Sequence, residues 1–518
     1  MKKIASIINF VRSVEPRDEN NGRTYLLPTL REELELCKAY GWRSTLLFQY
    51  DALIEREYRA LAAEYGDAVE TGLWLEVVGP QARDAGLLWR GEYVWDWREG
   101  VNYLSTYPME ERRRLLDTAF GRYYEFYGTY PKVVGCWSLD SGSVAYLKEK
   151  YDITAVCICK EQFGTDYTTL WGGVYNGGYY PSKKNLLCPA NSKSQQIDVP
   201  VFRMLGPDPI YQYDMGLGEP DRAQSVCTLE PVYAEGGGSE TWVEWYLCEN
   251  YNDKCLSHAY AQFGQENSFG WEAIKNGLPM QFRLLNDKAK AGEIEIMTLG
   301  EAGEWYRKSY ALTAPVAMCT DSDWKKQGYR SVWYASRFYR ANLLSQNGRL
   351  WLRDLQLFDD NYPSECADAG SANPETGSFN LPVTDGFRFS KNGIRAGIWF
   401  ETDAPIKKDA PLVSEARGED AIHAEQGPFT VDFLPEKIVC TLPEAGAVLR
   451  FRFADLPWIP YREATEKTLK MAFRGFGKRE YPYALTLSRG RFIRDETGLF
   501  ISPENGTVVM ETGRDPRV

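Results

Sequence analysis

The chain has 518 residues, which is too long for one ordinary domain and predicts about two to four domains. Apolar residues make up 44% and charged residues 25% of the sequence, as is typical of globular proteins. The formal net charge is -12 and the sequence pI is near 5.1. Phosphate groups repel such a protein, so nucleic acid and anionic membranes are not expected partners.

The sequence favours a soluble, cytoplasmic protein. Its first apolar run, Ile4 to Val11, is interrupted by Asn9 and lacks a small-residue cleavage site, which argues against a signal peptide. No stretch approaches the roughly 20 apolar residues of a membrane span. The 11 cysteines are odd in number and dispersed, which indicates reduced thiols. Cys157 and Cys159 lack nearby histidines, so we expect neither a metal nor another cofactor.

In the first three-fifths of the chain, short apolar runs alternate with segments of helical periodicity. The expected strands are residues 4–11, 44–49, 69–78, 133–137, 153–159, 199–205, 259–265 and 293–299. The expected helices are residues 30–40, 55–65, 108–127, 143–150 and one that ends near residue 310. This alternation predicts an α/β fold, a (β/α)7-type barrel over residues 1–315, with long loops at 161–198 and 206–240.

The pattern changes near residue 316. Residues 337–344 and 349–358 flank Asn347-Gly348, which predicts a hairpin with a type I′ turn. Further short strands are expected at residues 386–389, 394–400, 429–433, 437–442 and 447–453. These patterns predict an all-β sandwich domain over residues 316–518.

Residues 29–155 resemble the polysaccharide deacetylase superfamily and the related barrel of glycoside hydrolase family 57. The segments that carry this resemblance are TLREELELCKAYGWRSTLLF, TGLWLE, YPMEERRRLLDTAFGRYYEFYGTYPKVVGCW and LKEKYDIT. They follow one another in the helix and strand order of that superfamily. The resemblance implies a barrel fold and activity on carbohydrates.

The chain departs from the metal-dependent members of that superfamily, which bind a metal through an Asp and two His. The chain has only two histidines, His258 and His423. Trp74 and Glu76 stand where a histidine is expected, and the first strand lacks the Asp pair. The resemblance that remains is to retaining glycosidases, which use two carboxylates at strand ends and no metal.

Asp140 and Glu266 are the candidate catalytic pair. Asp140 follows the fourth strand, where the resembling glycosidases carry their nucleophile, although its Asp-Ser-Gly-Ser context equally suits a helix N-cap. Glu266 lies in a polar segment between glycines and aromatic residues, where those enzymes carry the acid/base carboxylate. The alternative for Glu266 is a first-turn residue that interacts with the dipole of the next helix.

Other residues at strand ends and in loops are candidates for binding a carbohydrate substrate. Carboxylates accept hydrogen bonds from sugar hydroxyls, and tryptophan or tyrosine rings stack on sugars or fill the core. The candidates are Glu76, Glu161, Asp166, Asp208, Trp74, Trp137, Trp171, Tyr175 and Trp271.

The sequence therefore favours a glycoside hydrolase or transglycosidase. One alternative is a deacetylase-like carbohydrate esterase on the same fold. The other is a carbohydrate-binding protein without catalysis.

Overall fold

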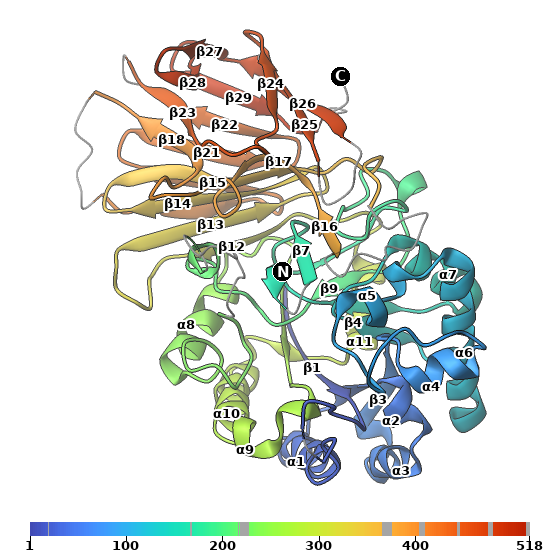
Figure 1. The fold of residues 1–518 in the computed structure, drawn as a ribbon. Helices are drawn as coiled ribbons and strands as arrows, with labels where there is room; N and C mark the ends of the chain where they lie inside the picture. Colours follow the sequence, from blue (N-terminus) through green and yellow to red (C-terminus); the bar gives the residue numbers. More distant parts are fainter. Residues whose placement is uncertain are drawn as a thin grey trace.

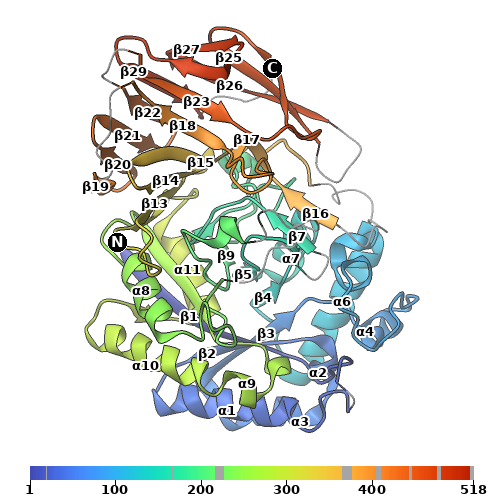
Figure 2. The same cartoon turned by 60° about the vertical axis from the view of Figure 1, so that its left-hand side comes forward.

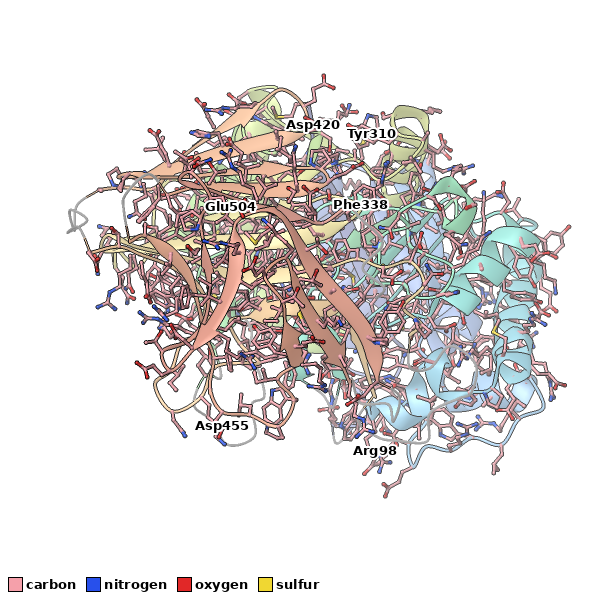
Figure 3. All side chains as sticks on the ribbon, turned by 90° about the horizontal axis from the view of Figure 1, so that it is seen from above. Arg98, Tyr310, Phe338, Asp420, Asp455 and Glu504 are labelled. Carbon is pink, nitrogen blue, oxygen red and sulfur yellow. The ribbon has the colours of Figure 1, made fainter. Side chains whose placement is uncertain are left out.

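The computed structural model describes residues 1–18, 20–165, 168–215, 217, 227–364, 376–403, 410–442, 446–474, 480–513. The chain forms an α/β unit, from strand β1 to helix α11, and a β-rich unit, from strand β12 to strand β29 (Figure 1). Polar side chains cover the outside of both units, with Arg98 on the α/β unit and Glu504 on the β-rich unit (Figure 3).

A curled, mostly parallel sheet forms the centre of the α/β unit (Figure 2). Its order is β10-β1-β2-β3-β4-β5-β9-β8, and the first seven of these strands are parallel to their neighbours. The strands are β10 (His258–Phe263), β1 (Lys2–Val11), β2 (Ser44–Phe48), β3 (Val69–Trp74), β4 (Val133–Cys136), β5 (Ala155–Ile158), β9 (Val201–Arg203) and the antiparallel β8 (Gly178–Tyr179).

The sheet is not closed by backbone pairing. Within the described residues, no ladder joins β9 to β10. The side chain of Gln262 bridges the gap, since its Oε1 accepts from the Leu205 amide at 3.0 Å and its Nε2 donates to the Ile8 carbonyl at 3.2 Å. The predicted α/β class with a parallel, barrel-like sheet is therefore confirmed, whereas a closed (β/α)7 barrel is not shown.

Helices cover the outside of the curled sheet (Figure 1). They are α1 (Leu26–Ala39), α2 (Tyr50–Ile54), α3 (Arg56–Glu64), α4 (Gly79–Asp84), α5 (Glu99–Asn102), α6 (Met109–Tyr127), α7 (Ser141–Tyr151), α8 (Glu240–Asn250), α9 (Trp271–Ile274), α10 (Gly277–Lys290) and α11 (Leu299–Ser309). Gly128, with φ of 70°, ends α6 as the sequence predicts. Strand β11 (Glu295–Ile296) is shorter than expected because Thr298 and Glu301 form a capping box that begins α11.

Two antiparallel sheets form most of the β-rich unit, and their inner faces share one hydrophobic core. One sheet contains β12 (Val316–Thr320), β13 (Tyr329–Ala335), β14 (Tyr339–Gln346), β15 (Arg349–Leu357), β18 (Gly397–Glu401), β23 (Val448–Arg452), β28 (Gly498–Ser502) and β27 (Arg491–Asp495), with β17 (Leu381–Asp385) paired to β15. The other contains β19 (Val413–Arg417), β20 (Ala421–Gln426), β21 (Phe429–Leu434), β22 (Lys437–Thr441), β29 (Thr507–Glu511), β26 (Tyr481–Arg489), β25 (Thr468–Phe473) and β24 (Tyr461–Ala464).

The predicted hairpin is confirmed as β14 and β15, and both turn residues, Asn347 and Gly348, have positive φ. The strand expected at residues 386–389 is wrong, because this segment is a turn. The Asp385 carboxylate accepts hydrogen bonds from the amides of Phe387 and Arg388, and this local bonding bends the chain away from a ladder.

A small third sheet joins the two units. It contains β6 (Gln162–Thr165) and β7 (Thr168–Trp171) from the α/β unit and β16 (Thr376–Phe379) from the β-rich unit. Strand β16 runs parallel to β7, between the two units (Figures 1 and 2). The part of the chain that the structure describes contains no helix with the length and apolar character of a membrane span.

Gly72 allows β3 and β4 to pack closely inside the curled sheet. A methyl group added there would overlap the Val133 carbonyl oxygen and lie 2.8 Å from the Leu47 side chain. We expect Gly72→Ala to lower the free energy of unfolding by about 1–3 kcal/mol, because a packed core resists added volume. Gly121→Ala is the matched control, since Gly121 lies in α6 with nothing near its added methyl, and it should be neutral or stabilising. Urea unfolding of both variants checks this, and equal stabilities would contradict it.

Candidate functional site

A cavity of about 220 Å³ opens at the carboxyl ends of the parallel strands. Arg12 follows β1, Glu76 follows β3, Lys160 follows β5, Leu205 follows β9 and Glu266 follows β10. The lining residues are Arg12, Arg17, Glu76, Trp95, Trp97, Tyr103, Trp137, Lys160, Gln162, Leu205, Glu230, Tyr233, Glu266, Ser268 and Phe269. Strand ends in this type of sheet are where ligands bind, so this cavity is the candidate site.

The buried guanidinium of Arg12 joins two carboxylates of the cavity. Its Nη2 lies 2.9 Å from Glu76 Oε2, and its Nη1 forms an ion pair with Glu266. The same Nη1 donates to Ser268 Oγ at 3.1 Å, and the guanidinium lies 4.0 Å from the centre of the Trp95 ring. These carboxylates keep the pKa of Arg12 above its ordinary value, so Arg12 is the fixed positive charge of the site.

Glu76 is a fully engaged carboxylate. Besides Arg12, its Oε2 accepts from Trp74 Nε1 at 2.8 Å and from Gln49 Nε2 at 2.9 Å. The Trp74 ring stacks on the Phe10 ring, with the two ring centroids 4.3 Å apart. Hydrogen bonds of this kind fix the position of a carboxylate. Glu76 therefore orients Arg12, and Trp74 lies behind the cavity wall.

Glu266 lies against Arg12 at the start of a short 3-10 turn, Asn267–Phe269. Its side chain makes no capping bond to that turn, and it is directed instead to Arg12 and the cavity. Burial raises the pKa of Glu266, and the positive charge of Arg12 opposes the increase. The structure thus places this predicted residue among charged groups in the cavity.

Glu230 and Lys160 form a second pair of titratable groups that the sequence analysis missed. Burial raises the pKa of Glu230 to about 7, with Lys160 lowering it and Glu266 raising it. Burial lowers the pKa of Lys160, whose Nζ donates to the Glu161 carbonyl at 3.2 Å. Lys160 directly follows an expected strand, and this position could have identified it as a candidate site residue. Glu230 lies in a long loop of the sequence and carried no such signal.

Aromatic rings form much of the remaining wall. Trp137, a predicted residue, packs edge-on against Phe10 at 5.1 Å, and Trp95 and Trp97 enter from the segment that follows β3. Arg17 lies over both of these rings, with its guanidinium carbon 5.1 and 5.8 Å from their centres. The cavity thus combines charged groups with flat apolar surfaces.

Asp140 does not line this cavity. Its contacts are those of a helix N-cap, the alternative role that its sequence also suits. Its carboxylate accepts from the Ser143 amide at 2.9 Å and from Ser143 Oγ at 2.6 Å, at the N-cap of α7. It also pairs with the buried Arg112 at 2.8 Å. A carboxylate with these bonds stabilises the fold, so we do not include Asp140 in the candidate site.

Several other predicted residues lie elsewhere. Glu161, Trp171 and Tyr175 contact the β-rich unit, the last through a ring stack on Trp333 at 3.7 Å. Asp208 accepts from Trp242 Nε1 at 2.8 Å and from Trp324 Nε1 at 2.9 Å. Trp271 is half-buried in α9 and is not among the cavity residues. Asp166 lies outside the described residues.

Neither histidine is among the residues that line the cavity. His258 Nε2 accepts from the Gly178 amide at 2.9 Å, and burial lowers the pKa of this histidine to about 3. His423 lies on β20, where its Nδ1 is 2.7 Å from Asp432. Both side chains are thus used in packing and in hydrogen bonds outside the cavity.

No family model and no curated protein matches the chain. Among solved structures, a candidate glycoside hydrolase/deacetylase from Parabacteroides distasonis is 17% identical, with a TM-score of 0.57 over 73% of this chain and 90% of that one. A 4-alpha-glucanotransferase from Thermococcus litoralis is 10% identical, with a TM-score of 0.33 over 98% and 97%. A GH57-type branching enzyme from Pyrococcus horikoshii is 11% identical, with a TM-score of 0.30 over 57% and 69%.

The first of these likenesses shows a shared fold, and it agrees with the resemblance that residues 29–155 carry. The chain thus shares the fold of that candidate glycoside hydrolase/deacetylase over 73% of its length, and it has a cavity of acidic, basic and aromatic side chains at its strand ends.

We expect Asp140→Asn to lower the free energy of unfolding by about 3–5 kcal/mol, because it removes the carboxylate charge of the buried ion pair with Arg112. Asparagine still caps a helix, so the loss reports on the ion pair. Ser143→Ala is the control, and it should cost about 1–3 kcal/mol through one lost bond to a charged group. Urea unfolding measures both, and a loss for Asp140→Asn no greater than that for Ser143→Ala would contradict the structural role.

The raised pKa of Glu230 predicts a pH-dependent stability. The folded protein retains this proton up to about pH 7, whereas an unfolded glutamate releases it near pH 4.3. The free energy of unfolding should therefore fall as pH rises between these values and then level off. Glu230→Gln should flatten this part of the curve, and the exposed Glu240→Gln should not. Urea unfolding between about pH 5 and 8 tests this, and parallel curves for wild type and Glu230→Gln would show that Glu230 ionises normally.

Proposed function

We propose that the protein is a carbohydrate-processing enzyme, a glycoside hydrolase or transglycosidase that uses two carboxyl groups. One observation carries this proposal: Glu230 and Glu266, both buried and with raised pKa values, line the same cavity beside aromatic rings. Cleavage of a glycosidic bond needs a protonated carboxyl group and an ionised one on the two sides of that bond. Tryptophan and tyrosine rings supply flat apolar surfaces against which a sugar ring packs.

Glu230 is the proposed acid. Its pKa of about 7 keeps a proton available near neutral pH, and this proton passes to the oxygen of the leaving group as the bond to the anomeric carbon breaks. Burial raises this pKa and the charge of Lys160 opposes the rise, so the position of Lys160 contributes to the working pH of the acid.

Glu266 is the proposed second carboxylate. Arg12 favours its ionised form, which then attacks the anomeric carbon or takes a proton from the attacking water. From the sequence, Asp140 is the expected nucleophile. We now assign the pair to Glu230 and Glu266, because Asp140 caps α7 and is bound to Arg112.

The two alternative functions, an esterase and a carbohydrate-binding protein, would require different residues in the cavity. A deacetylase-like esterase of the metal-dependent kind would place histidines at the strand ends, whereas His258 and His423 lie in other parts of the fold. A binding protein would use the same aromatic walls and would leave the glycoside intact.

The decisive experiment measures release of nitrophenol from α- and β-linked nitrophenyl glycosides. We expect one glycoside to be cleaved, and Glu266→Gln to reduce kcat by about 100-fold or more. Glu230→Gln should be far less damaging for dinitrophenyl than for mononitrophenyl glycosides, because a better leaving group needs less protonation. Glu249→Gln is the control, since Glu249 is a buried carboxylate bonded to Ser322 away from the cavity.

Other results would favour an esterase or a binding protein over a glycosidase. Release of acetate from acetylated sugars without nitrophenol release would favour the esterase. Calorimetric binding of a glycoside that is never cleaved would favour the binding protein. Full activity in both cavity variants would overturn the assignment of Glu230 and Glu266.

A further inference from the structure

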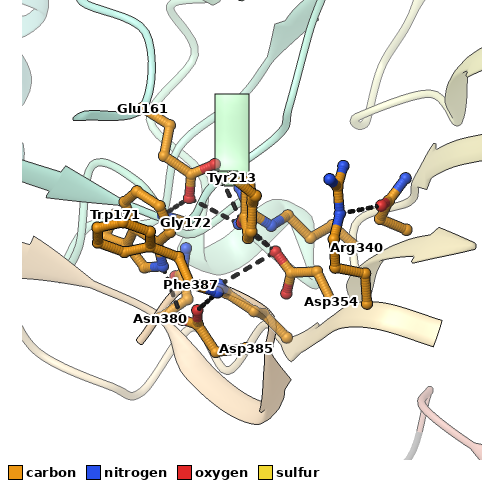
Figure 4. Close-up of polar contacts among 12 residues, drawn as sticks. Glu161, Trp171, Gly172, Tyr213, Arg340, Asp354, Asn380, Asp385 and Phe387 are labelled. Atoms are coloured by element: carbon orange, nitrogen blue, oxygen red, sulfur yellow. Dashed lines mark hydrogen bonds and ion pairs between the residues drawn. The ribbon is translucent and has the colours of Figure 1, made fainter. Parts of the chain in front are cut away.

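A buried charge cluster lies where the two units meet (Figure 4). At its centre is Arg340 on β14, whose Nη2 is 2.6 Å from Glu161 Oε1 and 2.5 Å from Asp354 Oδ2. The Tyr213 hydroxyl also contacts this Nη2 and lies 3.2 Å from Glu161 Oε2. The three charged side chains are between 0% and 2% exposed, so each depends on the others for charge compensation.

The cluster holds one segment of the α/β unit in several places. The Gly172 amide donates to Glu161 Oε1 at 2.6 Å, and Arg340 Nη1 donates to the Gly173 carbonyl at 3.3 Å. Trp171 donates from Nε1 to Asp385 of the β-rich unit at 2.7 Å (Figure 4). Glu161, Trp171 and Gly173 are therefore each bonded to a side chain from the other unit.

This segment also forms part of the cavity wall. Lys160 and Gln162 both line the cavity, and Glu161 lies between them in the sequence. Side chains of successive residues in extended chain point to opposite sides. The side chain of Glu161 accordingly reaches Arg340, whereas those of its two neighbours reach the cavity.

The position of the Lys160 amine also depends on Glu161. Among the described residues, the hydrogen bond of Lys160 Nζ is to the backbone carbonyl of Glu161. The backbone of Glu161 is in turn held by its own side chain through Arg340. A displacement of Glu161 would therefore move the Lys160 amine relative to Glu230.

We propose that Arg340 is a positioning residue of the active site: it fixes Glu161, and through Glu161 it places Lys160 and Gln162 in the cavity. The β-rich unit is thus a component of the site and not only a neighbouring support. The role of this placement in turnover rests on the proposed function, whereas the placement itself does not.

Reductive methylation of lysines with formaldehyde and a borane, followed by peptide mass spectrometry, tests the placement without requiring turnover. The variant is Glu161→Gln, which leaves Arg340 paired with Asp354 and so keeps the charges balanced. We expect Lys160 to be methylated about tenfold faster than in wild type, because a lost charge-assisted hydrogen bond frees the segment that carries it. Arg340→Lys should act in the same direction, since the single nitrogen of a lysine cannot replace the contacts that Nη2 makes with both carboxylates and that Nη1 makes with the Gly173 carbonyl.

Glu249→Gln is the matched control, because Glu249 also joins the units, through the amides of Asp321 and Ser322, but far along the chain from Lys160. It should leave the methylation of Lys160 unchanged. A wild-type rate in Glu161→Gln, in protein shown by circular dichroism to be folded, would overturn the proposal. An equal rise in Glu249→Gln would also overturn it, because that result would indicate general loosening of the two units.

A second readout uses the pH profile on whichever nitrophenyl glycoside is cleaved. Displacing Lys160 removes the charge that lowers the pKa of Glu230, so the limb assigned to Glu230 should move to higher pH in Glu161→Gln. An unmoved limb beside faster methylation would overturn the catalytic part of the proposal. If no glycoside is cleaved, the proposed function fails, and the methylation result alone decides the positioning role.

Discussion

The buried guanidinium of Arg12 lies between two carboxylates at the strand ends of the α/β unit. Its positive charge allows both carboxylates to be buried there. Two unpaired carboxylates in this interior would cost several kcal/mol each in lost hydration. Arg12 compensates Glu76 and Glu266 together, and Glu76 is further held by Trp74 and Gln49. The arrangement fixes one carboxylate as an anchor and leaves the other directed into the cavity, where Glu230 and Lys160 complete the set of titratable groups.

Much of the fold was predictable because its elements are set by local periodicity. The long helix that ends at Gly128 and the hairpin at Asn347-Gly348 follow from patterns within a few residues. The unclosed edge between β9 and β10 could not be predicted, since it depends on a side-chain bridge by Gln262 across the sheet. The turn after β17 was missed because the Asp385 carboxylate accepts hydrogen bonds from the amides of Phe387 and Arg388.

The candidate site was predictable only in part. Glu76, Trp137 and Glu266 meet in the cavity because parallel strands bring their ends to one edge. Glu161 and Asp208 follow strands as well, but their side chains turn to the β-rich unit or to indole donors. Position at a strand end therefore indicates the neighbourhood of a residue, whereas the direction of its side chain depends on contacts distant in the sequence. Glu230 illustrates the same limit, because a loop brings it into the cavity.

The pairing of β7 with β16 also constrains the order in which the protein is completed during synthesis. Thr168 pairs with Thr376, and Trp171 pairs with Phe379. At about 5–20 residues per second, a ribosome needs roughly ten to forty seconds to pass from the first strand to the second. Through that interval β7, which follows Lys160 and Gln162 in the chain, lacks its partner β16. The newly made α/β unit therefore gains the full support of this part of the cavity wall only after β16 has been made, and truncated chains that end before β16 lack the strand that pairs with β7.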